Sequence, residues 1–254
     1  AAPACTLIDH ALLLSQTSGG SVMDGLLSDG LRSYGNLLSY MTKPAEPYAG
    51  DYTPRTLVVN NSWAMFDSSW DFPVGTAQNY SHNPDHPFNI IVASLEAAGA
   101  DIVFAAGNCG IECPDERCGK SIMAGGIQGA NSSPAVTCVA GVLVENQERV
   151  GYSSKGPGRL DTSKPDIAAY THFAGSGVYP ADGGTSTAAP IVAGVIAAIR
   201  RLYPAHILSP ADLRDLLRRT ASTRNNAGFN VEYGHGVINV EGILSELDKL
   251  PSNF

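Results

Sequence analysis

The spacing of apolar residues along the chain predicts four helices. Leucines at 26, 27, 31, 37 and 38 recur at helical intervals, and residues 88–98 follow the same pattern up to Gly99. Residues 187–203 are apolar on every side until Arg200 and Arg201, which predicts a helix buried in the centre of the domain. Ser209 and Pro210 form an N-cap followed by proline, which predicts a helix from there to residue 219.

Short apolar runs between these segments predict strands. They cover residues 6–8, 56–60, 101–106 and 136–144, and the second is rich in β-branched residues and bounded by polar turns, as in a strand buried on both faces. Residues 43–54 and 63–87 are predicted to be loops. Alternation of strands and helices predicts an α/β fold with a largely parallel sheet flanked by helices, in a single domain without a linker.

Composition and charge then narrow the class of protein. The chain has 254 residues, 44% hydrophobic and 16% charged, which indicates a globular rather than a disordered chain. Its net charge of −8 and the lack of a basic stripe argue against a nucleic acid partner. The longest apolar run, residues 187–199, is shorter than the roughly 20 residues that span a bilayer. We expect neither a membrane span nor an intact signal peptide.

The segment with the clearest chemistry is residues 183–190, Gly-Gly-Thr-Ser-Thr-Ala-Ala-Pro, where a loop enters the predicted central helix. A serine at a helix N-terminus lies near free N–H groups that favour developing negative charge. Small neighbours let a substrate backbone approach closely. Taken alone, such a segment more often holds a helix cap, here Ser186 or Thr185, than a nucleophile.

Several motifs in order along the chain resemble the subtilisin-like serine peptidases. The nucleophile motif of that family, Gly-Thr-Ser-x-Ala-x-Pro, is matched by Gly184, Thr185, Ser186, Ala188 and Pro190. Further matching segments occur in family order at residues 58–63, 105–108, 153–157, 164–167 and 233–239. Each is weak by itself, but their common order makes coincidence implausible.

The resemblance implies a three-layer sandwich and a peptidase site. Ser186 would form the acyl-enzyme, and Asn108 would share the oxyanion with the Ser186 N–H. The expected partner is a protein or peptide substrate, bound in extended form along two walls of the first specificity pocket. These walls and the adjoining Thr185 give the expected substrate-binding residues Ser62, Trp63, Ala64, Ala105, Ala106, Gly107 and Thr185.

The aspartate and histidine of the family triad have no matching motif here. Neither Asp-Ser/Thr-Gly nor His-Gly-Thr-His occurs, and Asp9 and His10, as neighbours on a strand, would point to opposite faces. The first residues resemble a family strand that lies downstream of that histidine. We therefore expect residues 1–254 to form one subtilisin-like domain incomplete at its N-terminus, with the triad Asp and His outside this chain.

Two explanations for the missing base are open. In the first, the N-terminal portion of the domain exists elsewhere, either removed from this chain or bound to it as a second chain, which the intact Ser186, Asn108 and substrate strand favour. In the second, the chain is an inactive relative, a pseudopeptidase that binds peptides or proteins.

The positions of the five cysteines predict a loop disulfide and a core residue. Cys109, Cys113 and Cys118 fall within ten residues, which favours a loop disulfide of unspecified pairing over a metal site, since no histidine lies nearby. Cys138 is expected in the core. A disulfide would support a secreted or extracytoplasmic location. No cofactor is required, and calcium stays open because acidic loops are present without a run of ligand spacing.

Overall fold

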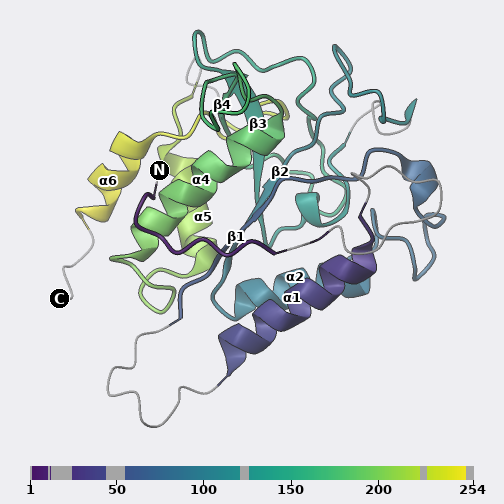
Figure 1. Cartoon of the computed structure of the whole chain (residues 1–254), viewed down its shortest axis with the longest axis horizontal. Coiled ribbons are helices and arrows are strands. Elements are labelled where there is room, and N and C mark those ends of the chain that lie inside the picture. The colour runs from purple at the N-terminus through teal and green to yellow at the C-terminus, as the bar shows by residue number, and fades with distance from the viewer. Residues whose placement is uncertain are drawn as a thin grey trace.

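A four-stranded parallel sheet forms the centre of the protein. The computed structural model describes residues 2–10, 12, 25–43, 55–120, 126–223 and 228–249. The strands are β1 (Val58–Asn61), β2 (Asp101–Ala105), β3 (Thr137–Leu143) and β4 (Ile167–Thr171). They lie side by side in chain order, and every neighbouring pair is parallel (Figure 1). All four carboxyl ends therefore meet at one edge of the sheet.

Helices cover both faces of this sheet. On one face α1 (Leu27–Thr42) and α2 (Pro87–Ala97) pack together, and on the other lies α4 (Thr185–Arg200), followed by α5 (Pro210–Thr220) and α6 (Val240–Leu247) (Figure 1). Alternate residues of β2 serve the two cores: Ile102 and Phe104 pack on the α1–α2 side, and Val103 and Ala105 on the α4 side. The predicted three-layer α/β architecture is confirmed.

A buried ion pair joins the end of α4 to the start of β2. The Arg200 guanidinium donates to both carboxylate oxygens of Asp101, at 2.5 and 2.7 Å, and also to the carbonyls of Tyr203 and Leu208. The sequence pattern marked Arg200 only as the polar end of an apolar helix. In the structure it also fixes where the central helix ends.

The two outer strands differ in how they are covered. Beside β4, the main chain of Ala168 exchanges hydrogen bonds with Gly236 and Ile238. At the other side β1 has β2 as its sole strand neighbour within the described residues, and Asn60 is exposed. The prediction that residues 56–60 form a strand buried on both faces is wrong in burial, because this strand is at the margin of the described sheet.

Other predicted elements had mixed outcomes. Residues 6–8 do not form a strand; they pair with no neighbour among the described residues, and Leu7 is 89% exposed. Of the predicted loop at 43–54, residues 44–54 lie outside the described residues. The predicted loop 63–87 holds one short helix, η1 (Ser68–Trp70), and a second, η2 (Gly129–Ser132), precedes β3. Strand β4 and helix α6 were not predicted.

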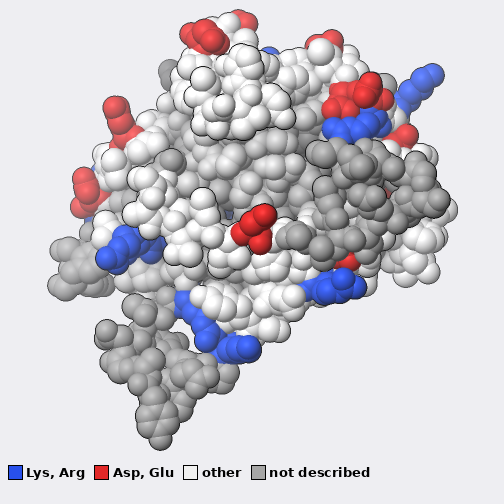
Figure 2. Space-filling model, viewed as in Figure 1, with Lys and Arg blue, Asp and Glu red and all other residues white. Residues whose placement is uncertain are grey.

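Two observations concern a membrane span and the distribution of basic side chains. None of the described helices is long and apolar enough to cross a membrane. On the face seen in Figure 2, Lys and Arg side chains form separate groups rather than a stripe.

Candidate active site

The site lies where the first turn of α4 meets the carboxyl ends of β1 and β2. Gly184 caps the helix with φ of +85°, a conformation that favours glycine, and Thr185 and Ser186 are the first two helical residues. Their N–H groups belong to the first turn, which has no carbonyl partners within the helix. A Cβ at position 184 would lie 3.2 Å from Asn108 Nδ2. Glycine therefore lets the nucleophile turn approach the asparagine.

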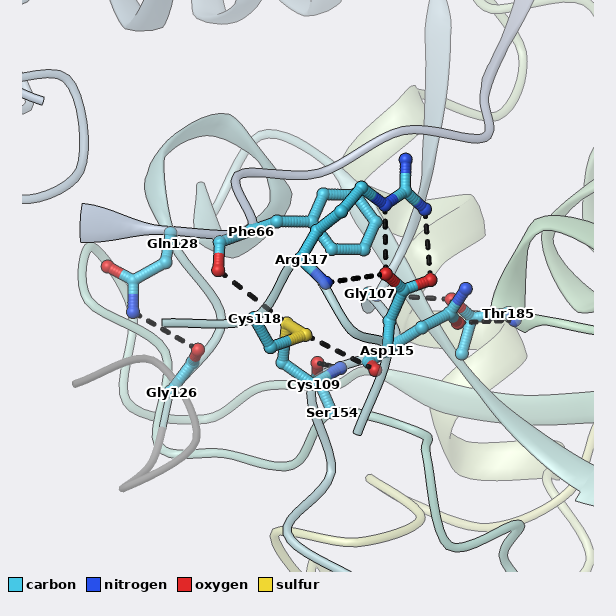
Figure 3. The surroundings of a disulfide bond; sticks show 11 residues. Phe66, Gly107, Cys109, Asp115, Arg117, Cys118, Gly126, Gln128, Ser154 and Thr185 are labelled. Atoms are coloured by element: carbon cyan, nitrogen blue, oxygen red, sulfur yellow. Dashed lines mark hydrogen bonds and ion pairs between the residues drawn. A yellow bond between two sulfur atoms is a disulfide. The ribbon is translucent and has the colours of Figure 1, made fainter. Parts of the chain in front are cut away.

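Two hydrogen bonds from Thr185 fix the side chain of Asn108. Its Oδ1 accepts from the Thr185 N–H and from Thr185 Oγ1, both at 2.9 Å, and Thr185 Oγ1 accepts in turn from the Gly107 N–H at 3.1 Å (Figure 3 shows this last contact). Within the described residues, Asn108 Nδ2 donates no hydrogen bond. That amide group is thus oriented and available to donate.

Ser186 and Ser62 are joined by a reciprocal pair of hydrogen bonds. Ser186 Oγ donates to the Ser62 carbonyl at 3.2 Å, and Ser62 Oγ donates to the Ser186 carbonyl at 2.9 Å. Ser62 follows β1 directly, whereas Ser186 is half-buried at the start of α4. The structure therefore brings together two predicted site residues that are far apart in sequence.

Tyr152 and Thr171 hold the peptide groups of Gly184, and sequence analysis missed both. The Gly184 N–H donates to Tyr152 Oη at 2.7 Å, Thr171 Oγ1 donates to the Gly184 carbonyl at 3.2 Å, and the two hydroxyls are 3.1 Å apart. Burial raises the pKa of Tyr152, so the phenol is neutral at physiological pH. Neither residue belongs to a motif, because their role depends on contacts between segments that are distant in sequence.

The two predicted pocket walls meet at Ala64 and Gly107. A Cβ on Gly107, whose φ is +102°, would lie 3.3 Å from Ala64 Cβ. Asn131 Nδ2 ties the segments together by donating to the carbonyls of Trp63 and Ala105, at 2.8 and 2.9 Å. Asn131 is a buried residue that the motifs did not indicate.

The other predicted wall residues are placed differently. The ring of Trp63 packs against the core on the α1–α2 side, with its centre 5.1 Å from that of Phe104. Ala105 and Ala106 are buried, each in a hydrophobic cluster, whereas Ser62 is exposed. For Trp63, Ala105 and Ala106, contact with an extended peptide would therefore have to come from the main chain.

A disulfide closes the loop that begins at the oxyanion candidate. Cys109 and Cys118 are bonded (Figure 3), and Asp115 N–H donates to the Asn108 carbonyl at 2.9 Å. Arg117 pairs with Asp115 at 2.8 and 3.0 Å and holds the pKa of that carboxyl below its usual value. The expected loop disulfide is confirmed.

The three remaining cysteines are free thiols. Cys5 and Cys113 are exposed, whereas Cys138 is buried, as expected for a core residue. Burial raises the pKa of the Cys138 thiol. No group of three His, Cys, Asp or Glu side chains suited to a metal ion occurs in the part of the chain that the structure describes.

No described carboxylate or imidazole hydrogen bonds to Ser186. Asp9 and His10 are exposed, and burial lowers the pKa of both His82 and His86, the second of which caps α2. His172, which no motif marked, lies beside the nucleophile turn: its Nε2 would be 3.8 Å from a Cβ on Gly183, and its Nδ1 is 3.5 Å from Tyr152 Oη. The described site thus contains a serine and an amide donor without a base.

Comparisons with known proteins agree with this geometry. A family profile, peptidase S8 of the subtilase family, matches residues 36–236. Subtilisin DY of Bacillus licheniformis is 34% identical over 57% of this chain and 47% of its own length. Alkaline elastase YaB of a Bacillus species is 31% identical over 59% of this chain and 34% of its own length. The chain thus spans about half the length of subtilisin DY and about a third of alkaline elastase YaB.

Solved structures share the fold. The prenylagaramide maturation protease PagA gives a TM-score of 0.59 at 19% identity, covering 88% of this chain and 69% of PagA. A serine-to-alanine mutant of the protease domain of PatA gives 0.54 at 19% identity, over 87% of this chain and 65% of that domain. Since the profile covers most of the sequence and the fold agrees, the chain belongs to the subtilase family of serine peptidases.

Proposed function

We propose that this chain supplies the nucleophile and oxyanion donor of a serine endopeptidase. Ser186 Oγ would bond to the carbonyl carbon of a peptide while a base takes its proton; the C–N bond then breaks, the amine leaves with that proton, and water hydrolyses the ester. The observation that carries the proposal is the fixed Asn108 amide, whose Oδ1 is held by Thr185 while Nδ2 remains free among the described residues.

The developing oxyanion has two donors in this proposal. Asn108 Nδ2 lies against Gly184, and the Ser186 N–H belongs to the first turn of α4, where the helix dipole also favours negative charge. A neutral amide is suited to this role because it keeps its geometry and is not screened in a site that excludes water.

The substrate in this proposal is an extended protein or peptide segment. The Ser62–Ala64 and Ala105–Gly107 segments flank the site, and Asn131 binds the main chain of both. A rigid pair of main-chain walls suits recognition of a peptide backbone.

The general base and its aspartate are proposed to come from polypeptide outside these 254 residues. The sequence contains neither triad motif, and no described imidazole hydrogen bonds to Ser186. The Cys109–Cys118 disulfide supports an oxidising, extracytoplasmic location for the assembled enzyme.

The same lack of a base favours the second candidate, a pseudopeptidase that binds peptides without cleaving them. A fluorophosphonate probe separates the two, because it bonds covalently only to an activated serine. We expect the complete natural protein to be labelled at Ser186, with labelling lost in Ser186→Ala and retained in Ser163→Ala, an exposed serine elsewhere. Absence of labelling where a known subtilisin reacts would establish the pseudopeptidase.

A further inference from the structure

A proline inside α4 leaves the carbonyl of the nucleophile without its helical partner. In an α-helix the N–H of residue 190 would donate to the carbonyl of residue 186. Position 190 is Pro190, which has no N–H and whose ring crowds the carbonyl four residues earlier. The Ser186 carbonyl must therefore find a donor outside the helix.

That donor is the hydroxyl of Ser62. Ser62 Oγ lies 2.9 Å from the Ser186 carbonyl oxygen. Asn60 Nδ2 donates to Ser62 Oγ at 3.1 Å, so the Asn60 amide occupies an acceptor position of the hydroxyl and its proton is free to point at Ser186. In return, Ser186 Oγ donates to the Ser62 carbonyl at 3.2 Å.

We infer that Ser62 is a positioning residue, whose hydroxyl replaces the helix hydrogen bond removed by Pro190 and so fixes the Ser186 turn against β1. The first turn of a helix is the part most prone to fraying, and this contact anchors it to the sheet at the residue that would attack the substrate. This role differs from a main-chain contact of Ser62 with substrate. Its catalytic consequence rests on the proposed function, but the hydrogen-bond exchange does not.

A double-mutant cycle in stability tests the exchange without reference to activity. Ser62→Ala should lower the folding equilibrium constant about fivefold when residue 190 is proline, the usual worth of one hydrogen bond. In a Pro190→Ala background, the new N–H serves the Ser186 carbonyl, so Ser62→Ala should cost much less. Ser163→Ala, the control, should have the same effect in both backgrounds. An equal cost of Ser62→Ala in both overturns the inference.

Labelling kinetics of the complete natural protein test the positioning. With a saturable fluorophosphonate, Ser62→Ala should lower the maximal labelling rate about fivefold at an unchanged half-saturating concentration. Ser62→Thr, which keeps the hydroxyl, and Ser62→Ala/Pro190→Ala should both recover most of that rate. A wild-type rate in Ser62→Ala overturns the inference. If the wild-type protein is not labelled at all, the proposed function fails and the stability cycle alone decides the inference.

Discussion

Asn108 is the residue at which geometry and proposed chemistry coincide most closely. Its amide could rotate to present either oxygen or nitrogen to a substrate, and the two donors from Thr185 determine which. With Oδ1 occupied, the nitrogen lies beside Gly184 and donates no hydrogen bond within the described residues. The proposed oxyanion role requires this orientation of the amide.

Replacing Asn108 should therefore affect reaction more than folding. Asn108→Asp keeps the acceptor for Thr185 but removes the donor, and we expect fluorophosphonate labelling of the complete protein to slow by about 10²–10³, the range for oxyanion asparagine loss in subtilisin itself. Asn146→Ala, an exposed asparagine, is the control and should label normally. Labelling of Asn108→Asp at the wild-type rate would remove Asn108 from the oxyanion site.

Tyr152 contacts the nucleophile turn at Gly184 and does not contact Ser186 itself in the described structure. Tyr152→Phe removes the acceptor of the Gly184 N–H and should slow labelling about fivefold, because one hydrogen bond on the nucleophile turn is lost. Tyr170→Phe is the matched control, since its hydroxyl contacts Gln147 instead. Equal rates for the two variants would show that the Gly184 contact does not matter for reactivity.

Among the elements, the loop from Asn108 to Cys118 is held by its disulfide rather than by secondary structure. Cys109→Ser/Cys118→Ser should lower the free energy of unfolding by about 2–3 kcal/mol, from the chain entropy that a loop of this length restores to the unfolded state. Thermal unfolding of the double variant measures this loss. Cys113→Ser, which alters an exposed free thiol in the same loop, should unfold like the wild type.

Strand β4 begins at a buried charge cluster that ties three elements together. Lys164 Nζ donates to Asp166 at 2.7 Å and to the Val136 carbonyl at 2.7 Å, and Arg218 on α5 donates to the other Asp166 oxygen at 2.9 Å. Burial alone would raise the pKa of Asp166, but Lys164 and Arg218 outweigh it and hold that pKa below its usual value.

This cluster predicts sensitivity to acid. Because the pKa of Asp166 is lowered by folding, its contribution to stability is complete above its unfolded pKa, near 3.9, and is lost as the pH falls through the folded pKa. Asp166→Asn should cost about 3–5 kcal/mol at pH 7 and should weaken the fall in Tm below about pH 4. Thermal unfolding between pH 7 and 2 checks both, with Asp85→Asn as an exposed control.

At the scale of the whole molecule, periodic patterns predicted most of the framework. Helices α1, α2, α4 and α5 and strands β2 and β3 followed from apolar spacing and caps, because each buries a regular face. Strand β4 was missed because its apolar run is short and follows directly on the motif at residues 164–167. The exposure of β1 was missed because position within a sheet is a tertiary property.

Only part of the candidate site could be predicted from the sequence. Ser186 and Asn108 were found because the family motif fixes their order, and the structure brings them together through Thr185. Tyr152, Thr171 and Asn131 were not found, since their contacts span 13 to 68 residues of sequence and no local pattern marks them. The orientation of the Trp63 side chain was also not predicted, because it depends on packing against the aromatic rings of Phe88 and Phe104.

The 254-residue chain alone is predicted to be almost unreactive at Ser186. In subtilisin, loss of the histidine alone lowers kcat by about 2 × 10⁶. We therefore expect the isolated chain to label at Ser186 too slowly to detect, and labelling to appear when polypeptide bearing the triad aspartate and histidine is present. Rapid labelling of the isolated chain would place a base within these residues.

Pro190 has a consequence for how related sequences can change. With proline at 190, the hydroxyl at 62 has a carbonyl to serve. If a helix-forming residue replaced the proline, the helix would serve that carbonyl itself and alanine at 62 would be tolerated. Positions 62 and 190, distant in sequence, should therefore substitute together in an alignment of homologues, with serine or threonine at 62 accompanying proline at 190.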